Sequence, residues 1–184
     1  MPGRIDETAE FIPIGIVVMT ISDTRTPKDD KSGDVLAERV KTAGHHLITR
    51  TIVHDDIDEI RAMLTLWCED PEIDAVISTG GTGVTGRDVT PEAFRGVFDK
   101  EIEGFGEMFR ALSMAKIGTS AMQSRAVGGV AKGTYLFALP GSPSACKDGW
   151  DDILHYQLDI RHRPCNFVEI MPRLMEQGIG GRSG

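Results

Sequence analysis

The sequence predicts an α/β protein, a three-layer α/β/α sandwich with a mostly parallel sheet and a short antiparallel edge hairpin. Residues 14–21 form a continuous apolar, β-branched run, which is typical of a strand covered by helices on both faces. Strand and helix patterns then alternate along the chain, as they do in parallel sheets with right-handed crossovers. Two short strand patterns, 125–131 and 134–139, flank Lys132-Gly133, which suits a tight hairpin turn.

The first half of the chain predicts two helices and two further strands. Residues 32–43 carry apolar positions at helical spacing. Residues 46–53 alternate between apolar and polar positions, which is typical of a strand nearer the sheet edge. A helix follows, and either Asp55 or Asp56 caps it. Residues 74–78 then predict a third buried strand.

The second half predicts three more helices. Thr90-Pro91-Glu92 is typical of a helix start, with the threonine as N-cap and the proline at the first helical position. Residues 101–117 predict a longer helix, broken or delayed near Gly104 and Gly106. Residues 144–157 predict a helix that follows the last sheet strand.

The length of 184 residues fits one domain. We place that domain at residues 13–175, between a polar N-terminal arm at 1–12 and a frayed tail at 176–184. Residues 1–11 carry charges throughout and do not resemble a signal peptide, and the apolar run at 14–21 is too short to cross a membrane. We therefore expect a soluble cytoplasmic protein without a membrane partner.

The charge of the chain bears on its partners. A formal net charge of −8 disfavours nucleic acid, because like charges repel the phosphate backbone. A small phosphorylated ligand in a local pocket is still compatible with that charge. The three cysteines have no zinc-site spacing and predict reduced thiols, as in the cytoplasm.

Polar loops leave several predicted strands at the same edge of the sheet. They begin at Ser22-Asp23, His54-Asp55-Asp56, Thr79 and Pro140. Ligands of such sheets bind in the crevice beyond the carboxyl ends of the strands. We therefore expect these four segments to meet in space although they are far apart in sequence.

The segment Thr79-Gly80-Gly81-Thr82-Gly83 is the leading candidate for a site. Three glycines let the backbone approach a ligand, and successive N–H groups can form an anion-binding concavity. Thr79 and Thr82 add hydroxyl groups. The segment has neither the Walker nor the Rossmann spacing. A tight turn that requires positive φ angles explains the same residues equally well.

Carboxylates and a second turn accompany this loop. Asp88 could hold Mg²⁺ beside a phosphate, although spacing alone favours a helix-start charge or a salt bridge to Arg87. Asp55 could share that metal, but a helix cap and a solvated loop explain Asp55-Asp56 more simply. Gly141-Ser142-Pro143 offers helix-start amides to an anion, or is a plain strand-to-helix turn.

Together these segments resemble the molybdenum cofactor biosynthesis family, in particular its MoaB branch, over roughly residues 14–174. A glycine loop alone is weak evidence, whereas the ordered set is highly specific. The segments that carry the resemblance are Thr20-Ile21-Ser22-Asp23-Thr24-Arg25, residues 78–83, Arg87-Asp88-Val89-Thr90-Pro91-Glu92-Ala93, Gly104-Phe105-Gly106-Glu107, Ile117-Gly118-Thr119-Ser120-Ala121, Ser124-Arg125-Ala126, Phe137-Ala138-Leu139-Pro140-Gly141-Ser142-Pro143 and Pro164-Cys165-Asn166-Phe167.

The resemblance implies a domain that binds molybdopterin, a pterin dithiolene with a terminal phosphate. In the active relatives, ATP and Mg²⁺ adenylylate that phosphate and pyrophosphate is released. It also implies a homo-oligomer, with a hexamer favoured over a trimer. The expected substrates are therefore molybdopterin and ATP, and the expected metal is Mg²⁺.

The resemblance also implies roles for individual residues. The two catalytic aspartates, which would also hold the metal, match Asp55 and Asp88. The family often has proline where His54 stands, which leaves the choice between Asp55 and Asp56 open. We assign molybdopterin binding to Gly141, Ser142 and Pro143. We assign the nucleotide and phosphate site to Ser22, Asp23, Thr79, Gly80, Gly81, Thr82 and Gly83.

Three functions are compatible with these residues. The first is a molybdopterin adenylyltransferase. The second is a paralogue that binds molybdopterin with little or no turnover and acts as a carrier or scaffold in the same pathway. The third is a nucleotide pyrophosphatase like the N-terminal domain of the competence-damage proteins, which share this fold. A missing second domain and the segment Pro164-Cys165-Asn166-Phe167 argue against the third.

Overall fold

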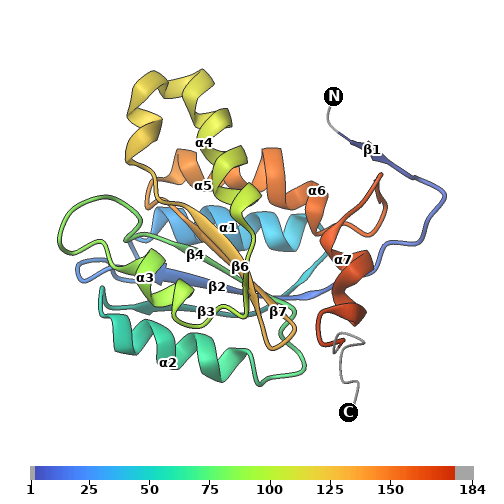
Figure 1. Cartoon of the computed structure of the whole chain (residues 1–184), viewed down its shortest axis with the longest axis horizontal. Coiled ribbons are helices and arrows are strands. Elements are labelled where there is room, and N and C mark those ends of the chain that lie inside the picture. Colours follow the sequence, from blue (N-terminus) through green and yellow to red (C-terminus); the bar gives the residue numbers. More distant parts are fainter. Residues whose placement is uncertain (1–2, 177–184) are drawn as a thin grey trace, which may run out of the picture.

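A computed structural model describes residues 3–176 of the chain. It contains a six-stranded sheet between two layers of helices, which confirms the predicted three-layer α/β fold (Figure 1). In sheet order the strands are β3 (His46–Val53), β2 (Gly15–Ile21), β4 (Ala75–Thr79), β7 (Thr134–Leu139), β6 (Val127–Ala131) and β5 (Lys100–Glu101). The first four run parallel, whereas β6 pairs antiparallel with both β7 and β5.

Each face of the sheet buries its own apolar cluster. One cluster contains Ile16 and Val18 of β2 and packs beneath α1 (Lys31–Thr42), α4 (Glu103–Ile117) and α5 (Pro143–Gly149). The other contains Val17 and Met19 and packs beneath α2 (Ile57–Trp67) and α3 (Thr90–Arg95). All seven residues of β2 are buried because alternate side chains of a central parallel strand enter the two opposite clusters.

Shorter elements complete the described chain. They are β1 (Arg4–Ile5), η1 (Gly118–Gln123), η2 (Trp150–Leu154), α6 (His155–Gln157), β8 (His162–Arg163), α7 (Phe167–Ile170) and η3 (Met171–Arg173). β1 pairs antiparallel with β8, so part of the predicted N-terminal arm lies against the C-terminal segment of the same chain. Of the predicted frayed tail, residues 177–184 lie outside the described residues. No helix in residues 3–176 is long and apolar enough to cross a membrane.

The predicted hairpin turn is confirmed, and its backbone explains its sequence. Lys132 and Gly133 have φ angles of 48° and 86°, the left-handed conformation that two-residue hairpin turns require. The predicted helix 101–117 has a delayed start and no break: α4 begins at Glu103, next to Gly104, and is continuous to Ile117. Gly106 serves packing instead: a Cβ there would lie 2.4 Å from the carbonyl oxygen of Ala126.

Two predicted helix starts differ from the structure. Thr90 is the first residue of α3 and not its N-cap, and its hydroxyl donates to the carbonyl oxygen of Gly80 at 2.9 Å. The predicted helix 144–157 begins one residue earlier, at Pro143, and Ser142 caps it by accepting from the N–H of Ala145. The π-helical turn η2 lies in the middle of this run, which continues through α6.

The carboxyl ends of the parallel strands are in register. Thr20 of β2 pairs with Ile52 and with Thr79, and Thr79 pairs with Leu139. The loops that follow all four strands therefore leave the sheet at one edge. This register is the reason why segments distant in sequence can build one site.

A buried carboxylate, Asp30, fixes the loop after β2 to this edge. Its side chain is fully buried and accepts hydrogen bonds from Thr20 Oγ1 at 2.7 Å, from the N–H of Gly33 at 3.0 Å and from Arg50 at 2.8 Å. Arg25 lies 3.6 Å from the same carboxylate. Burial acts to raise the pKa of Asp30, but these hydrogen bonds outweigh it and hold the pKa below its ordinary value.

We predict that Asp30→Ala lowers the free energy of unfolding by about 3 kcal/mol, because it removes a helix cap and leaves Arg50 without its buried partner. Urea unfolding at pH 7 measures this loss. Asp34→Ala is the matched control: Asp34 also pairs with Arg50 but is exposed, so its loss should stay below about 1 kcal/mol.

The pH dependence of the Asp30 effect has a defined sign. Because the folded pKa is lowered, the carboxylate stabilises the fold at neutral pH, and this contribution disappears as the pH falls from the ordinary value of 3.8 through the folded value. The difference between wild type and Asp30→Ala should shrink in that range. A difference that grows in acid would contradict the assigned role.

Candidate functional site

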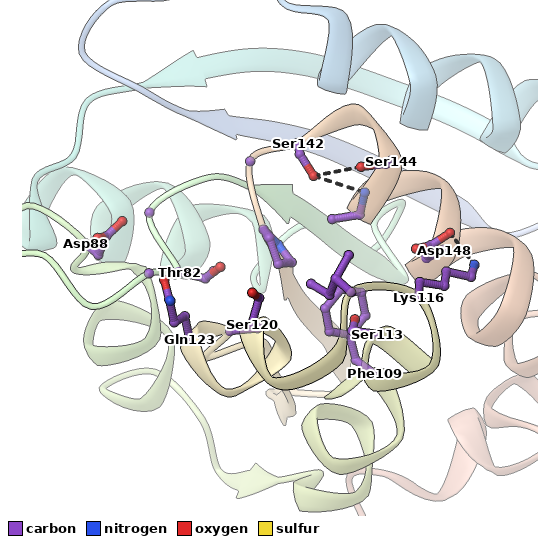
Figure 2. A pocket seen from close by; sticks show the side chains of 17 residues that line it. Thr82, Asp88, Phe109, Ser113, Lys116, Ser120, Gln123, Ser142, Ser144 and Asp148 are labelled. Carbon is purple, nitrogen blue, oxygen red and sulfur yellow. Dashed lines mark hydrogen bonds and ion pairs between the residues drawn. The ribbon is translucent and has the colours of Figure 1, made fainter. Parts of the chain in front are cut away.

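A cavity of about 420 Å³ opens at the carboxyl edge of the sheet (Figure 2). The glycine loop lies on one side of it, the start of α5 on another, and α4 with η1 closes the third. Asp88 and Ser142 both line this cavity although they lie 54 positions apart in the sequence. The volume is within the range of small-molecule sites. Of the predicted residues, those that line it are Gly81, Thr82, Gly83, Asp88, Gly141 and Ser142.

Every carbonyl group from residue 80 to residue 83 is hydrogen-bonded within the protein. Thr90 donates its hydroxyl to the oxygen of Gly80 and its N–H to that of Gly81, at 2.9 and 3.1 Å. Arg125 donates its N–H to Thr82 at 2.9 Å and its Nε to Gly83 at 2.6 Å. In a planar trans peptide the next N–H points opposite to the carbonyl, so the loop N–H groups point away from these donors.

The loop amides remain available for a ligand. The N–H groups of Gly81 and Thr82 have no acceptor among residues 3–176. Gly80 and Gly81 have φ angles of 107° and 64°, so the requirement for a positive-φ turn is also met. The two interpretations of the glycine loop are therefore compatible, because the tight turn is what aligns the amides as an anion-binding concavity.

The Gly-Ser-Pro turn is built in the same way. Thr79 donates its hydroxyl to the carbonyl oxygen of Pro140 at 2.9 Å. Arg25 and Ser32 both donate to the oxygen of Gly141 at 2.7 Å. The N–H groups that follow these carbonyls point to the opposite side, toward which the start of α5 also presents its amides. Pro143 lies in the first turn of α5 and does not line the cavity.

Asp55 and Asp88 lie beside the glycine loop on neighbouring segments. A Cβ built on Gly81 would be 2.9 Å from the Asp55 carboxylate, and one built on Gly83 would be 2.8 Å from that of Asp88. Asp56 is occupied elsewhere: it caps α2 by accepting from the N–H groups of Asp58 and Glu59, both at 2.9 Å. The structure thus brings Asp55, and not Asp56, to the loop.

The two carboxylates have different environments. Burial raises the pKa of Asp55, and the nearby negative charge of Asp88 raises it further. Burial also acts to raise the pKa of Asp88, but hydrogen bonds from the hydroxyl and the N–H of Thr85, at 2.6 and 2.8 Å, hold it below its ordinary value. Two like charges close together favour a bound cation.

No group of three or more metal-ligating side chains occurs within the part of the chain that the structure describes. Mg²⁺ keeps several waters and is commonly held by one or two carboxylates together with substrate phosphates. Asp55 and Asp88 fit that second kind of site. They would hold the ion only when a phosphate of the ligand supplies further oxygens.

Besides Pro143, the predicted site residues that lie outside the cavity lining are Ser22, Asp23, Asp55, Thr79 and Gly80. Ser22 accepts hydrogen bonds from the N–H groups of Thr24 and Arg25 at 3.2 Å, within its own turn. Asp23 accepts from the N–H of Asp55 at 3.1 Å and pairs with Arg87. Thr79 is fully buried, and its single donor proton is committed to Pro140. The expectation that the Thr79 hydroxyl donates to a phosphate is corrected on this ground.

The sequence reasoning missed the residues that hold and close the site. Arg25 and Arg125 stood in the segments that carry the family resemblance, but nothing in their local sequence identifies the carbonyls they bind. The cavity wall from α4 and η1 was also missed, because its residues resembled an ordinary core or contact helix. That wall includes Phe109, Ser113, Lys116, Ser120 and Gln123, and Figure 2 shows them facing the loop and α5.

Comparison with known proteins gives consistent results. The family model described as "Probable molybdopterin binding domain" matches residues 17–160. The chain is 48% identical over 160 residues to molybdenum cofactor biosynthesis protein B of Escherichia coli K12, covering 87% of this chain and 94% of that protein.

Solved structures agree with the sequence relatives. A crystal structure of a molybdenum cofactor biosynthesis protein B has a TM-score of 0.81 and 39% identity, covering 90% of this chain and 98% of that one. The tungsten cofactor synthesizing protein MoaB from Pyrococcus furiosus has a TM-score of 0.70 and 36% identity, covering 77% and 91%.

We predict that Arg125→Lys lowers the free energy of unfolding by about 2 kcal/mol and loosens the glycine loop, because lysine lacks the planar fork that joins Gly83, Asp88 and Glu92. Chemical denaturation and amide exchange of residues 80–88 measure the two effects. Arg95→Lys is the matched control: its partner Glu101 is on the surface, so its effect should stay below about 1 kcal/mol. Equal effects of the two substitutions would contradict the role of Arg125.

Proposed function

The chain belongs to the molybdenum cofactor biosynthesis family of molybdopterin-binding domains, and from this membership we propose that it adenylylates the phosphate of molybdopterin with Mg-ATP. The observation that carries the proposal is the arrangement of the two turns. Their carbonyls are held from behind by Thr79, Thr90, Arg25 and Arg125, and their amides border one cavity. Two carboxylates flank the same loop.

The proposal divides the site into two phosphate positions. The Gly-Ser-Pro turn and the first amides of α5 bind the molybdopterin phosphate, since N–H groups at a helix start attract anions. The glycine loop binds the phosphates of ATP, together with Asp23, which accepts from the N–H of Asp55, and Ser22 in the same turn as Asp23. The two turns approach each other at Gly80 and Gly141: a Cβ on Gly141 would be 3.4 Å from the Cα of Gly80. The two turns are therefore in contact, as transfer between two phosphates requires.

The reaction joins these positions. An oxygen of the molybdopterin phosphate attacks the α-phosphorus of ATP, the bond from that phosphorus to the bridging oxygen breaks, and pyrophosphate leaves. Several negative charges must approach each other, so the main task of the chain is positioning and charge neutralisation. The turn amides neutralise part of that charge. Asp55 and Asp88 would hold Mg²⁺, which would neutralise further negative charge of the phosphates.

The predicted homo-oligomer is part of the proposal. α4 and η1 carry exposed apolar side chains, among them Met108, Met114, Ile117 and Met122. Large exposed apolar side chains can be covered in an assembly, and on this ground they support the predicted homo-oligomer. Light scattering coupled to gel filtration should give about 120 kDa for six chains of 20.0 kDa, the hexamer favoured over the trimer. A mass near 20 kDa would contradict the assembly.

A carrier or scaffold that binds molybdopterin without turnover is the second candidate. One observation favours it: Oδ2 of Asp88 already accepts two hydrogen bonds from Thr85, which compete with a metal ion for that oxygen. The two functions share the binding site and differ only in the transfer step. An assay of AMP transfer therefore separates them.

We predict that Asp88→Asn and Asp55→Asn each reduce AMP transfer to molybdopterin by roughly 100-fold or more, because each removes one of the charges proposed to hold the metal. Molybdopterin binding should persist in both. In Asp88→Asn the oxygen of the new amide can still accept from Thr85, so the loop itself should be retained. The assay measures pyrophosphate release and adenylylated molybdopterin with Mg-ATP.

Asp56→Asn is the matched control for that assay. Asp56 precedes α2 as its cap, and asparagine caps helices about as well as aspartate, so turnover should be unchanged. Wild-type turnover that survives Asp88→Asn would reject the catalytic role. A wild-type protein that binds molybdopterin but never releases pyrophosphate would establish the carrier instead.

A further inference from the structure

The cavity has two chemically different ends. At one end lie the turn amides that attract anions. At the other end Lys116 of α4 contacts Asp148 of α5, with 2.6 Å between Nζ and Oδ1, and both residues line the cavity. Lys116 also lies 3.2 Å from Asp152, which does not line it. Figure 2 shows the pair across the cavity from Asp88.

The charge at the second end excludes another phosphate. One ammonium and two carboxylates leave a net charge of −1, so an anion is repelled there. The hydrogen bond to Asp148 and then that to Asp152 raise the pKa of Lys116, which keeps its ammonium charged. The end therefore offers a carboxylate acceptor and a charged donor side by side.

Asp148 has one carboxylate oxygen that is available to a ligand. Its side chain is only 23% exposed, and Oδ1 accepts a hydrogen bond from Nζ of Lys116. Oδ2 accepts no hydrogen bond from any residue between 3 and 176. Buried or partly buried carboxylate oxygens are normally satisfied by a donor, so a ligand with N–H groups gains an interaction here.

This pair matches one kind of heterocycle edge. A 2-amino-4-oxo-pyrimidine ring presents an amino group, a ring N–H and a carbonyl oxygen in a row. The carboxylate of Asp148 accepts from the two donors, and Lys116 donates to the oxygen. The adenine of ATP presents an amino donor beside ring acceptors and lacks this pattern. Phe109 and Ile117 supply apolar cavity surface beside the ring.

We propose that Asp148 and Lys116 form the specificity-determining pair that reads the 2-amino-4-oxo-pyrimidine edge of the ligand, while the turn amides hold its phosphate. This inference rests on the proposed function and assigns the ring to the end of the cavity between α4 and α5. It also fixes the direction in which the ligand lies, with its phosphate toward Asp88.

Two probes that differ at one position test the pair. The first is 6-hydroxymethylpterin phosphate, and the second is the corresponding lumazine phosphate, in which an oxygen replaces the 2-amino group. Wild-type protein should bind the pterin at least about tenfold more tightly, because the oxygen of the lumazine faces the carboxylate and a charge-assisted hydrogen bond is lost. Fluorescence titration and calorimetry measure both dissociation constants.

In Asp148→Asn this preference should fall to about twofold or less, since the amide can turn a donor toward the lumazine oxygen. Asp152→Asn is the matched control: Asp152 also contacts Lys116 but does not line the cavity, so the tenfold preference should remain. Lys116→Gln should weaken the binding of both probes. Retained binding of inorganic phosphate in each variant shows that the turns are intact.

The outcomes distinguish this inference from the proposed function. If wild-type protein and Asp148→Asn bind both probes equally well, the phosphate site stands and the specificity pair is rejected. If wild-type protein binds neither probe, both proposals fail. A preference for the pterin that disappears in Asp148→Asn and persists in Asp152→Asn, together with weaker binding of both probes to Lys116→Gln, supports the pair.

Discussion

The site depends on the orientation of a few peptide planes. Carbonyls in the glycine loop and the Gly-Ser-Pro turn are bonded to donors outside the cavity, and planarity of the trans peptide then fixes the neighbouring N–H groups. Thr90 and Arg125 hold the carbonyls of the glycine loop, and Thr79, Arg25 and Ser32 hold those of the Gly-Ser-Pro turn. Arg25 is itself held beside the buried carboxylate of Asp30. Loop order, and with it anion binding, therefore rests on contacts behind the site.

The helices and strands were predictable from the sequence, whereas the side chains that bind the carbonyls of the two turns were not. Strand and helix periodicity is a local property, so β2, β3 and the hairpin turn at Lys132-Gly133 were predictable, as was the shared edge of the sheet. The donors to backbone carbonyls were not. Thr90 was expected to cap a helix and Thr79 to contact a phosphate, yet both hydroxyls bind carbonyls of a distant turn. Such partners are set by tertiary packing and leave no local pattern.

The proposed phosphate site is compatible with an acidic chain because its attraction is local. The net charge of −8 acts over the whole surface and is screened by salt, whereas aligned amides act at contact distance without adding a formal charge. Asp55 and Asp88 repel an anion by themselves, and the negative charge of Asp88 raises the pKa of Asp55. A divalent cation reverses the sign of that contribution. Under the proposed function, these two residues favour a ligand only when metal and phosphate bind together.

Under the two proposals, one end of the cavity supplies affinity for the phosphate, and the other end discriminates between ligand rings. The anion end is made of backbone amides, so few side-chain substitutions remove it, and any small phosphate compound satisfies it. The far end is made of the side chains of Lys116 and Asp148, and a change of one atom at Asp148 alters which ring edge is accepted. Discrimination requires a difference between ligands, and a ligand that leaves a partly buried carboxylate unpaired is penalised. Chains with this fold can therefore change the ligand ring by substitutions on α4 and α5 while the phosphate turns stay the same.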